Sequence, residues 1–400
     1  MFGASVLVPM LFGINASVVL FMNGVGTLIF FLVTKGKCPA FLGSSFAFIT
    51  PTLIILSCPE LGFQYALGGF VASGVAICIF ALIIKLCGIK WIDILLPPAV
   101  MGPIVALIGL ELADVAANQA GLLPLDGNFD FKKIIVFIVT LLTALLATMV
   151  FKGFFSVISI LISIIVGYSL SIFMGIVDFV PVIEAPLFNV PNFQLPKFEI
   201  NSILIILPAV LVVISEHIGH QIVTSKIIDR DLTRNPGLHR SLLGDGIATI
   251  FSGLAGSVPT TTYGENIGVM AITKVYSVWV IGGAAIISII IAFIGKVPAM
   301  IQTIPNPVMG GIGFLLYGMI ATSGIRLLVE AKVNYAKSRN LILTSIVFIA
   351  GLSKAYISIG EVRLTGMVLA TMLGIVLSLI LFILDKLNLT NDKEEENRIS

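Results

Sequence analysis

Residues 256–270 read Gly-Ser-Val-Pro-Thr-Thr-Thr-Tyr-Gly-Glu-Asn-Ile-Gly-Val-Met and place the carboxylate of Glu265 in an otherwise membrane-like sequence. Pro259, a run of threonines and two glycines interrupt the apolar run, so the helix after Tyr263 covers about ten residues, or roughly 15 Å. That is half of a bilayer. Irregular backbone at membrane depth is tolerated only where protein or a water-filled cavity surrounds it, so the stretch predicts a transport site. The alternative, a loop outside the membrane, is disfavoured by the flanking apolar runs 240–255 and 276–295.

The composition indicates a polytopic membrane protein rather than an enzyme or a soluble domain. Of the 400 residues, 58% are hydrophobic and 11% are charged, and the mean hydropathy is +1.11; soluble proteins use about 25% charged residues. The net charge of +2, with scattered basic residues, predicts no nucleic-acid partner. The four cysteines lack CxxC spacing, so we expect no disulfide, no metal and no cofactor.

Apolar runs bounded by Gly, Pro and charged residues predict an all-α membrane protein with fourteen transmembrane segments. Their approximate ranges are 1–11, 16–34, 44–57, 62–86, 94–112, 133–150, 153–177, 202–227, 240–255, 263–273, 276–295, 306–329, 339–352 and 363–386. The short third and tenth segments lie seven apart, as two repeats of seven segments would place them. Repeats of an odd number of spans are inverted relative to each other, so the two interrupted segments should face one another near the midplane.

Three weak internal matches occur in the same order in the two halves. Residues 96–102 (LPPAVMG) resemble residues 304–310 (IPNPVMG), and a glycine pair at 68–69 corresponds to the pair at 282–283. The third segment opens with a proline at 39, as the tenth does at 259. Together they favour an internal duplication.

The distribution of basic residues predicts that both termini are cytoplasmic. With fourteen spans and an N-terminus inside, 17 of the 23 Lys and Arg residues fall inside and 6 outside. The polar residues 391–398 then form a solvated cytoplasmic end.

The eighth segment carries three titratable groups near its middle, in the string Ser-Glu-His-Ile-Gly-His over residues 215–220. Glu216 and His220 are four residues apart and share a helical face. An ionised Glu at the bilayer centre costs about 2.5–3.5 kcal/mol. We therefore expect Glu216 to line a cavity or stay protonated, and either state suits a proton relay. The alternative is a structural Glu216–His220 bond, and His217, about 100° away, is expected to pack or cap.

Two other interpretations of the titratable groups are weaker. The order E-H-x-x-H is not the H-E-x-x-H of metalloproteases, and no third ligand is evident. Asp245, near the start of the ninth segment, could also be buried, but it follows His239 and Arg240 closely, and we therefore expect it to form an interfacial salt bridge or a helix cap.

The predicted site combines hydrogen-bond acceptors with donors. Glu216 and Glu265 accept N–H bonds, and free N–H groups at the start of the two half helices can bind carbonyl oxygens. A planar ligand with alternating N–H and C=O groups would satisfy both, with Phe46 or Tyr263 over its apolar face. Two acidic side chains suit an anion poorly. The chemistry favours a neutral, amide-like solute moved with protons.

Three strings carry a resemblance to a known family: TTYGENIGVM at 261–270, GSSFAF at 43–48 and EHIGH at 216–220. With them the chain resembles the bacterial uracil permeases, uracil:proton symporters of the nucleobase/ascorbate transporter family. The likeness runs over nearly the whole chain, including residues 100–102, 107–112 and 236–240. Xanthine and urate carriers usually place a Gln-Asn pair at the position of Glu265 and Asn266. The string TTYGENIG is therefore specific within the family.

The resemblance implies which residues carry the function. Glu216 and Glu265 would hold the uracil ring, and the backbone N–H groups of Phe46 and Gly264 would meet its carbonyls. Glu216, His220 and Glu265 would couple protons. The remaining pocket residues would be Ser45, Tyr263 and Tyr317.

The resemblance also implies the architecture: two inverted repeats, short antiparallel strands in the third and tenth segments, and alternating access between a core and a gate. The core would comprise residues 1–90 and 201–297, the gate residues 91–200 and 298–388, and the tail residues 389–400. It implies the bacterial inner membrane, a lipid bilayer around the spans and a homodimer.

Family members begin earlier, with a Gln-His pair in the first helix, so we expect an upstream start or a shortened first helix here. Two alternatives to a uracil:proton symporter remain: a carrier of another nucleobase, such as xanthine, and an ion or anion channel.

Overall fold

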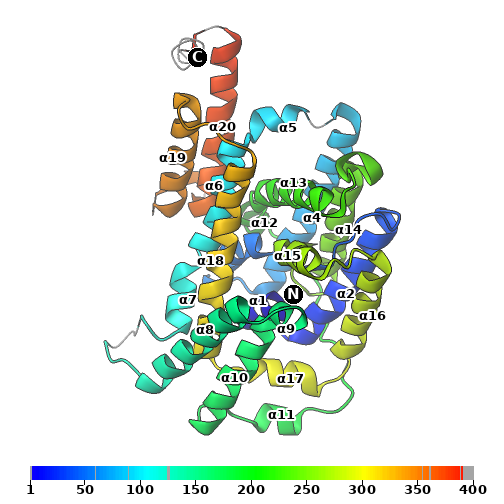
Figure 1. The fold of residues 1–400 in the computed structure, drawn as a ribbon, viewed down its shortest axis with the longest axis vertical. Helices are drawn as coiled ribbons and strands as arrows, with labels where there is room; N and C mark the ends of the chain where they lie inside the picture. Colours follow the sequence, from blue (N-terminus) through cyan, green and yellow to red (C-terminus); the bar gives the residue numbers. More distant parts are fainter. Residues whose placement is uncertain are drawn as a thin grey trace.

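The protein is predominantly helical, and most of its helices pack into two groups that lie side by side (Figure 1). The computed structural model describes residues 2–58, 60–88, 90–123, 127–353, 355–359, 362–387 and 389–390. The first group comprises α1 (Phe2–Phe12), α2 (Ala16–Val33), α3 (Ile49–Ser57), α4 (Phe63–Cys87), α12 (Ile200–Ile206), α14 (Leu238–Leu254), α15 (Gly264–Thr273) and α16 (Val278–Ala292). The second comprises α6 (Pro98–Leu110), α7 (Ala113–Gln119), α8 (Phe131–Val150), α9 (Phe154–Val157), α10 (Ser159–Phe173), α18 (Asn306–Glu330), α19 (Ser338–Leu352) and α20 (Gly366–Lys386).

Helix α13 (Ala209–Ile228) lies between the groups, because it contacts α4, α14 and α15 on one side and α6 and α20 on the other. Short elements connect the long helices. They are α5 (Lys90–Leu95), α11 (Val180–Glu184), the π-helical turn η2 (Thr233–Gly237), α17 (Lys296–Gln302) and the hairpin of β3 (Tyr356–Ile359) with β4 (Val362–Thr365).

Seven of the described helical stretches are long and apolar enough to cross a membrane. They are Ala16–Val33, Phe63–Cys87, Pro98–Gln119, Phe131–Val150, Ile200–Ile228, Asn306–Glu330 and Gly366–Lys386. Four shorter apolar helices of 10–17 residues accompany them, among them Ser159–Phe173 and Val278–Ala292. The chain is therefore a multi-pass membrane protein, and the arrangement of fourteen spans in inverted repeats stays a prediction.

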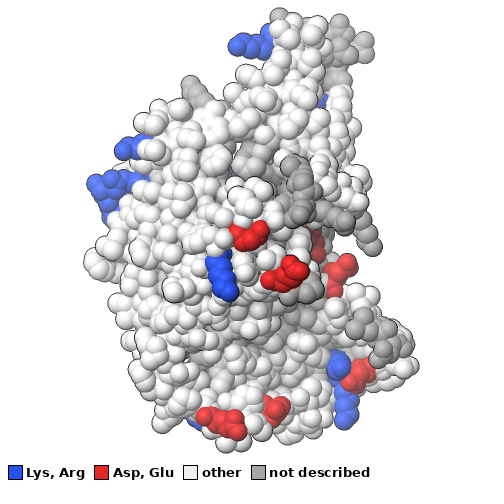
Figure 2. All heavy atoms as spheres, turned by 180° about the vertical axis from the view of Figure 1, so that it is seen from behind, with Lys and Arg blue, Asp and Glu red and all other residues white. Residues whose placement is uncertain are grey.

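The outer surface has the character expected of a protein in lipid. Large apolar side chains are exposed along α8, including Ile138, Leu142 and Leu146. Figure 2 shows a face with few charged side chains, which occur in small, separate groups. Lipid tails remove any penalty for exposing such side chains, whereas a charge at bilayer depth is costly.

Close helix crossings rely on small residues in both groups. In the first group, a Cβ added to Gly74 of α4 would lie 2.8 Å from the carbonyl oxygen of Gly246 in α14. In the second, a Cβ added to Gly324 of α18 would overlap the backbone of Gly102 and Ala106 in α6. Small residues let helix backbones approach within the membrane, where packing rather than water drives helix association.

Two three-residue strands meet inside the first group. Strand β1 (Leu42–Ser44) pairs antiparallel with β2 (Thr260–Thr262), in the register Leu42↔Thr262, Gly43↔Thr261 and Ser44↔Thr260. All six residues are buried. Each strand leads into a short helix: β1 into the 3₁₀ turn η1 (Phe46–Phe48) and α3, and β2 into α15.

Candidate functional site

The paired strands satisfy their backbone groups within the protein, as irregular backbone at membrane depth requires. The N–H of Leu42 donates to Thr27 Oγ1 at 2.9 Å, and the N–H of Ser45 donates to the Pro259 carbonyl at 2.9 Å. The Thr249 hydroxyl donates to the Thr260 carbonyl at 3.1 Å. The strand pair thereby fixes the first turns of η1 and α15, whose leading N–H groups have no acceptor within their own helix.

Three aromatic side chains from three elements meet beside these helix starts. The ring of Phe46 lies 6.5 Å from that of Tyr263 and 6.1 Å, edge-on, from that of Tyr317 in α18. Tyr263 is held by its hydroxyl, which donates to the Ser44 carbonyl at 2.9 Å. Its ring lies directly over Gly43, where a Cβ would overlap ring atoms. The structure therefore brings together the first residue of η1, the residue that precedes α15 and one residue of α18 in the second group.

Two hydroxyl groups in this part of the structure lack a hydrogen-bond partner among the described residues. Tyr317 and Ser45 are both buried, and their hydroxyl oxygens have no hydrogen-bond partner among the described residues. A buried polar group without a partner costs about 1–3 kcal/mol, so a ligand or water that bonds to it is stabilised.

Glu216 and His220 lie on one face of α13, close to the start of α15. Glu216 Oε1 is 3.8 Å from His220 Nε2, and both side chains are partly accessible. A Cβ added to Gly264 would lie 3.1 Å from His220 Nε2, so the first residue of α15 adjoins this pair. The backbone of Glu265 follows in α15, and its side chain lies outside the described part of the structure.

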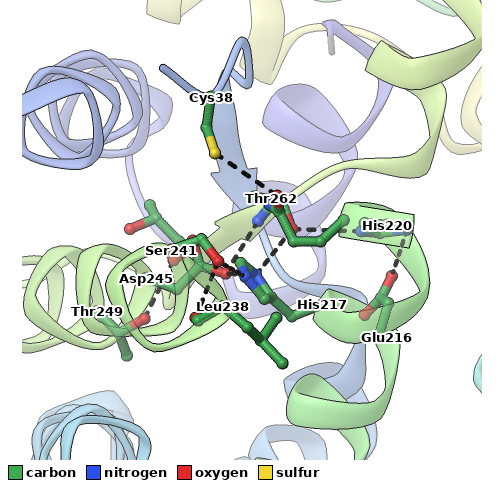
Figure 3. Close-up of polar contacts among 11 residues, drawn as sticks. Cys38, Glu216, His217, His220, Leu238, Ser241, Asp245, Thr249 and Thr262 are labelled. Carbon is green, nitrogen blue, oxygen red and sulfur yellow. Dashed lines mark hydrogen bonds and ion pairs between the residues drawn. The ribbon is translucent and has the colours of Figure 1, made fainter. Parts of the chain in front are cut away.

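Beside this pair lies a second, fully buried cluster that the sequence interpretation assigned wrongly (Figure 3). Asp245 of α14 is 0% exposed and His217 is 1% exposed, and Asp245 Oδ2 is 2.8 Å from His217 Nδ1. His217 Nε2 is 2.8 Å from Ser241 Oγ, and Asp245 Oδ2 also accepts the N–H of Thr262 at 3.4 Å. Asp245 is thus a buried partner of His217, not an interfacial partner of His239 or Arg240.

A usable signal for this cluster was present in the sequence. An acidic residue inside an apolar helix needs a partner at the same depth, and His217 is a titratable group in α13, the long helix that precedes α14 in the chain. The cluster joins three elements, because α13, α14 and β2 each contribute a group to it.

The described groups can accept an N–H bond at the Glu216 carboxylate, donate N–H bonds from the helix starts and stack aromatic rings on a flat molecule. No group of three or more His, Cys, Asp or Glu side chains within the described ranges could hold a metal ion. The arrangement suits binding of a small planar solute.

Sequence comparisons find close relatives among membrane transporters. The Xan_ur_permease family model, a permease family, matches residues 1–360. The uracil permease of Escherichia coli (strain K12) is 56% identical over 381 residues, which cover 95% of this chain and 88% of that protein. The uracil permease of Paenibacillus larvae subsp. larvae is 54% identical over 396 residues, covering 98% of this chain and 94% of that protein.

A solved structure shares the fold at low sequence identity. The transmembrane domain of the cyanobacterial bicarbonate transporter BicA superposes with a TM-score of 0.63 at 15% identity, covering 94% of this chain and 93% of that domain. This likeness establishes a transporter fold for the chain and gives no information on what it carries.

Proposed function

The chain belongs to this permease family, and on that premise we propose that it is a secondary transporter that imports uracil together with protons. The names of the relatives support the substrate: the chain is 56% identical to one uracil permease and 54% identical to another. The geometry of the site supports the manner of binding. Proton coupling rests on the titratable pair on α13.

The observation that carries the proposal is that the Glu216–His220 pair and the rings of Phe46, Tyr263 and Tyr317 lie beside the starts of η1 and α15. Uracil presents two N–H donors and two carbonyl acceptors on the edge of a flat ring. Glu216 and Glu265 would accept its N–H groups, and the backbone N–H groups of Phe46 and Gly264 would meet its carbonyls. The Phe46, Tyr263 and Tyr317 rings, with the Ser45 hydroxyl, would form the pocket wall.

We propose that the Glu216–His220 pair exchanges the coupled proton. The two side chains lie 3.8 Å apart and are partly accessible, so a small movement brings them into hydrogen-bond contact. A carboxylate beside an imidazole can exchange a proton as a ligand arrives or leaves. Glu265 is the second acidic group that we assign to this coupling.

The transport cycle that we propose is alternating access between two rigid parts. The core comprises residues 1–90 and 201–297, and the gate comprises residues 91–200 and 298–388, in fourteen spans that form two inverted repeats. The packing of helices into two groups supports this division. Residues 389–400 form a cytoplasmic tail, and both termini lie in the cytoplasm of a bacterial cell. A homodimer in the inner membrane completes the proposal.

Two alternatives give different results in transport assays. A carrier of another nucleobase, such as xanthine, would prefer a purine in competition. The fold by itself would also allow an anion carrier or channel, since the matched structure is a bicarbonate transporter. Glu216 beside the helix starts opposes an anion, because a carboxylate repels negative charge.

Binding of labelled uracil, with unlabelled competitors, tests the substrate. Uracil and its small 5-substituted analogues should displace the label at the lowest concentrations, ahead of xanthine and guanine. Preferred displacement by a purine would refute uracil as the substrate.

Replacement of each acidic side chain tests the contacts. Glu216→Gln and Glu265→Gln put a donor where the ligand's N–H needs an acceptor, so each should weaken uracil binding by about 5- to 150-fold, the equivalent of about 1–3 kcal/mol. Glu184→Gln, which changes an exposed acid in α11, is the matched control and should bind as the parent does. Parent-like affinity in Glu216→Gln would remove that residue from the site.

A further inference from the structure

One hydroxyl group contacts both pairs of titratable side chains on α13. Thr262 Oγ1 of β2 lies 3.3 Å from His220 Nδ1 and 3.3 Å from His217 Nδ1 (Figure 3). His220 Nε2 lies 3.8 Å from Glu216 Oε1, and His217 Nδ1 lies 2.8 Å from Asp245 Oδ2. These groups form a continuous chain from the candidate binding site to a fully buried carboxylate.

We propose that the Thr262 hydroxyl relays a proton between the two pairs, and that the Asp245–His217 pair is a second proton acceptor in the transport cycle. This inference rests on the proposed proton-coupled function and extends it to residues on α14 and β2. Asp245 and His217 are positioned away from the ligand and act through His220.

The relay can be written with its bonds balanced. The proton on His217 Nδ1 passes to Asp245 Oδ2, the Thr262 hydroxyl proton passes to His217 Nδ1, and the proton on His220 Nδ1 passes to Thr262 Oγ1. Three bonds to hydrogen break and three form. The result is that His220 changes from imidazolium to neutral imidazole, while Asp245 changes from carboxylate to carboxylic acid.

The surroundings of His217 accommodate these exchanges. Ser241 Oγ is 2.8 Å from His217 Nε2 and 3.0 Å from the Leu238 carbonyl. When Nε2 carries a hydrogen, it donates to Ser241 Oγ, whose own hydrogen goes to Leu238. When Nε2 is bare, the Ser241 hydroxyl rotates and donates to it. His217 therefore keeps a partner in both of its protonation states.

The surroundings of Asp245 complete the step. Its Oδ1 atom is buried and has no hydrogen-bond partner among the described residues, whereas Oδ2 faces both His217 and the Thr262 N–H. After Oδ2 takes the proton, rotation of the carboxyl group about Cβ–Cγ exchanges the two oxygens. A bare oxygen then faces His217 Nδ1–H again, and no hydrogen bond of Oδ1 has to break.

Other titratable groups border the chain and belong in any account of its pH dependence. The relay itself contains Glu216, His217 and His220 on α13 and Asp245 on α14, and the groups beside it come from three other parts of the protein. Tyr263 and Glu265 lie at the start of α15. Tyr317 faces the site from α18, and Cys38, before β1, is hydrogen-bonded to Gln221 at 3.6 Å.

Substitutions in β2 separate the relay from the fold. Thr262→Val removes the hydroxyl at nearly constant volume, and Thr262→Ser restores it. Thr261→Val is the matched control, because its side chain points to the opposite face of the same strand. Asp245→Asn keeps an oxygen acceptor for His217 Nδ1–H, but it cannot take up a proton.

The measurement uses proteoliposomes loaded with a pH-sensitive dye, in which uracil binding, uracil accumulation and proton entry are followed together. Thr262→Val and Asp245→Asn should bind uracil within about threefold of the parent, while proton-driven accumulation should fall at least tenfold. Thr262→Ser and Thr261→Val should accumulate uracil as the parent does.

Two results would overturn the relay. Parent-like accumulation by Thr262→Val or Asp245→Asn would show that no proton needs this route. Loss of uracil binding in both would show that the cluster acts only by shaping the site. A parent chain that ignores the proton gradient would instead refute the proposed function, so the two failures are distinguishable.

Discussion

The contact between Tyr263 and Gly43 gives a direct test of how the strand pair builds the pocket. A Cβ at position 43 would overlap the Tyr263 ring, which is held over the strand by its hydroxyl bond to Ser44 at 2.9 Å. Gly43→Ala should therefore push the ring aside. Overpacking costs about 1–3 kcal/mol and the lost hydrogen bond about 1 kcal/mol, partly offset by the 0.5–1 kcal/mol that Ala gains over Gly.

The net expectation is a loss of about 1–3 kcal/mol in the free energy of unfolding. Unfolding of the purified protein in detergent measures it, and Gly283→Ala is the control, because nothing lies within 4 Å of a Cβ added there. The control should be as stable as the parent or slightly more stable. Uracil binding by Gly43→Ala should weaken, since Tyr263 packs against Phe46.

A double-mutant cycle attributes the effect to this contact. When Tyr263→Leu removes the ring, Gly43→Ala should cost clearly less than it does alone, by a coupling of about 0.5–3 kcal/mol. The reasoning is refuted if Gly43→Ala unfolds like the parent, or if the two substitutions are simply additive.

Three further predictions test separate parts of the structure. Tyr317→Phe removes a buried hydroxyl without a described partner, so the Tm of the ligand-free protein should stay the same or rise, and uracil binding should weaken by about fivefold, or about 1 kcal/mol. A lowered Tm with unchanged affinity would contradict this. Gly324→Ala should disrupt the α6–α18 crossing, lowering the free energy of unfolding by about 1–3 kcal/mol and with it the Tm. Gly318→Ala should leave the Tm unchanged, because nothing lies within 4 Å of a Cβ added there. Desolvation raises the pKa of the Glu199 carboxyl, but the hydrogen bonds that it accepts from Ser202 and from the Asn201 N–H outweigh this, and the net pKa is lowered. Glu199 therefore stabilises the start of α12 above its unfolded-state pKa of about 4.3, by about 1 kcal/mol, and stability curves of the parent and of Glu199→Gln should converge as the pH falls through the lowered folded-state pKa; a difference that persists in acid would contradict the assignment.

The interrupted segments could be located from the sequence, because the residues that interrupt a helix act on the backbone close to them. Proline at 39 and 259, the threonine run and the glycine at 264 each act within a few residues of the backbone that they disrupt. The i, i+4 spacing of Glu216 and His220 likewise follows from helix geometry alone, and the two side chains lie 3.8 Å apart.

The Asp245–His217 pair depends on how two helices pack, which local patterns do not encode. Asp245 follows Arg240 by five residues, which turns it by about 140° on the helix and away from the charged end that it was expected to join. Its partner lies 28 residues earlier in the chain, on α13. Thr262 became part of the same cluster only through the pairing of β2 with β1, so its contact with both histidines could not be inferred from spacing.

The assignment of Tyr317 to the pocket also lay beyond the residue pattern. It sits in an uninterrupted apolar stretch of α18, and only the resemblance to a transporter family singled it out. In the structure the centroid of its ring lies 6.1 Å from that of Phe46 in η1.

Uptake of labelled uracil into proteoliposomes, with and without an inward proton gradient, tests the central claim most directly. We expect uracil to accumulate above its external concentration only with the gradient, to leak out when a protonophore collapses it, and to stay at equilibrium in vesicles that contain Glu216→Gln. Uptake that is equally fast and equally extensive without the gradient would contradict proton coupling, and no uptake above empty vesicles under either condition would contradict uracil transport itself.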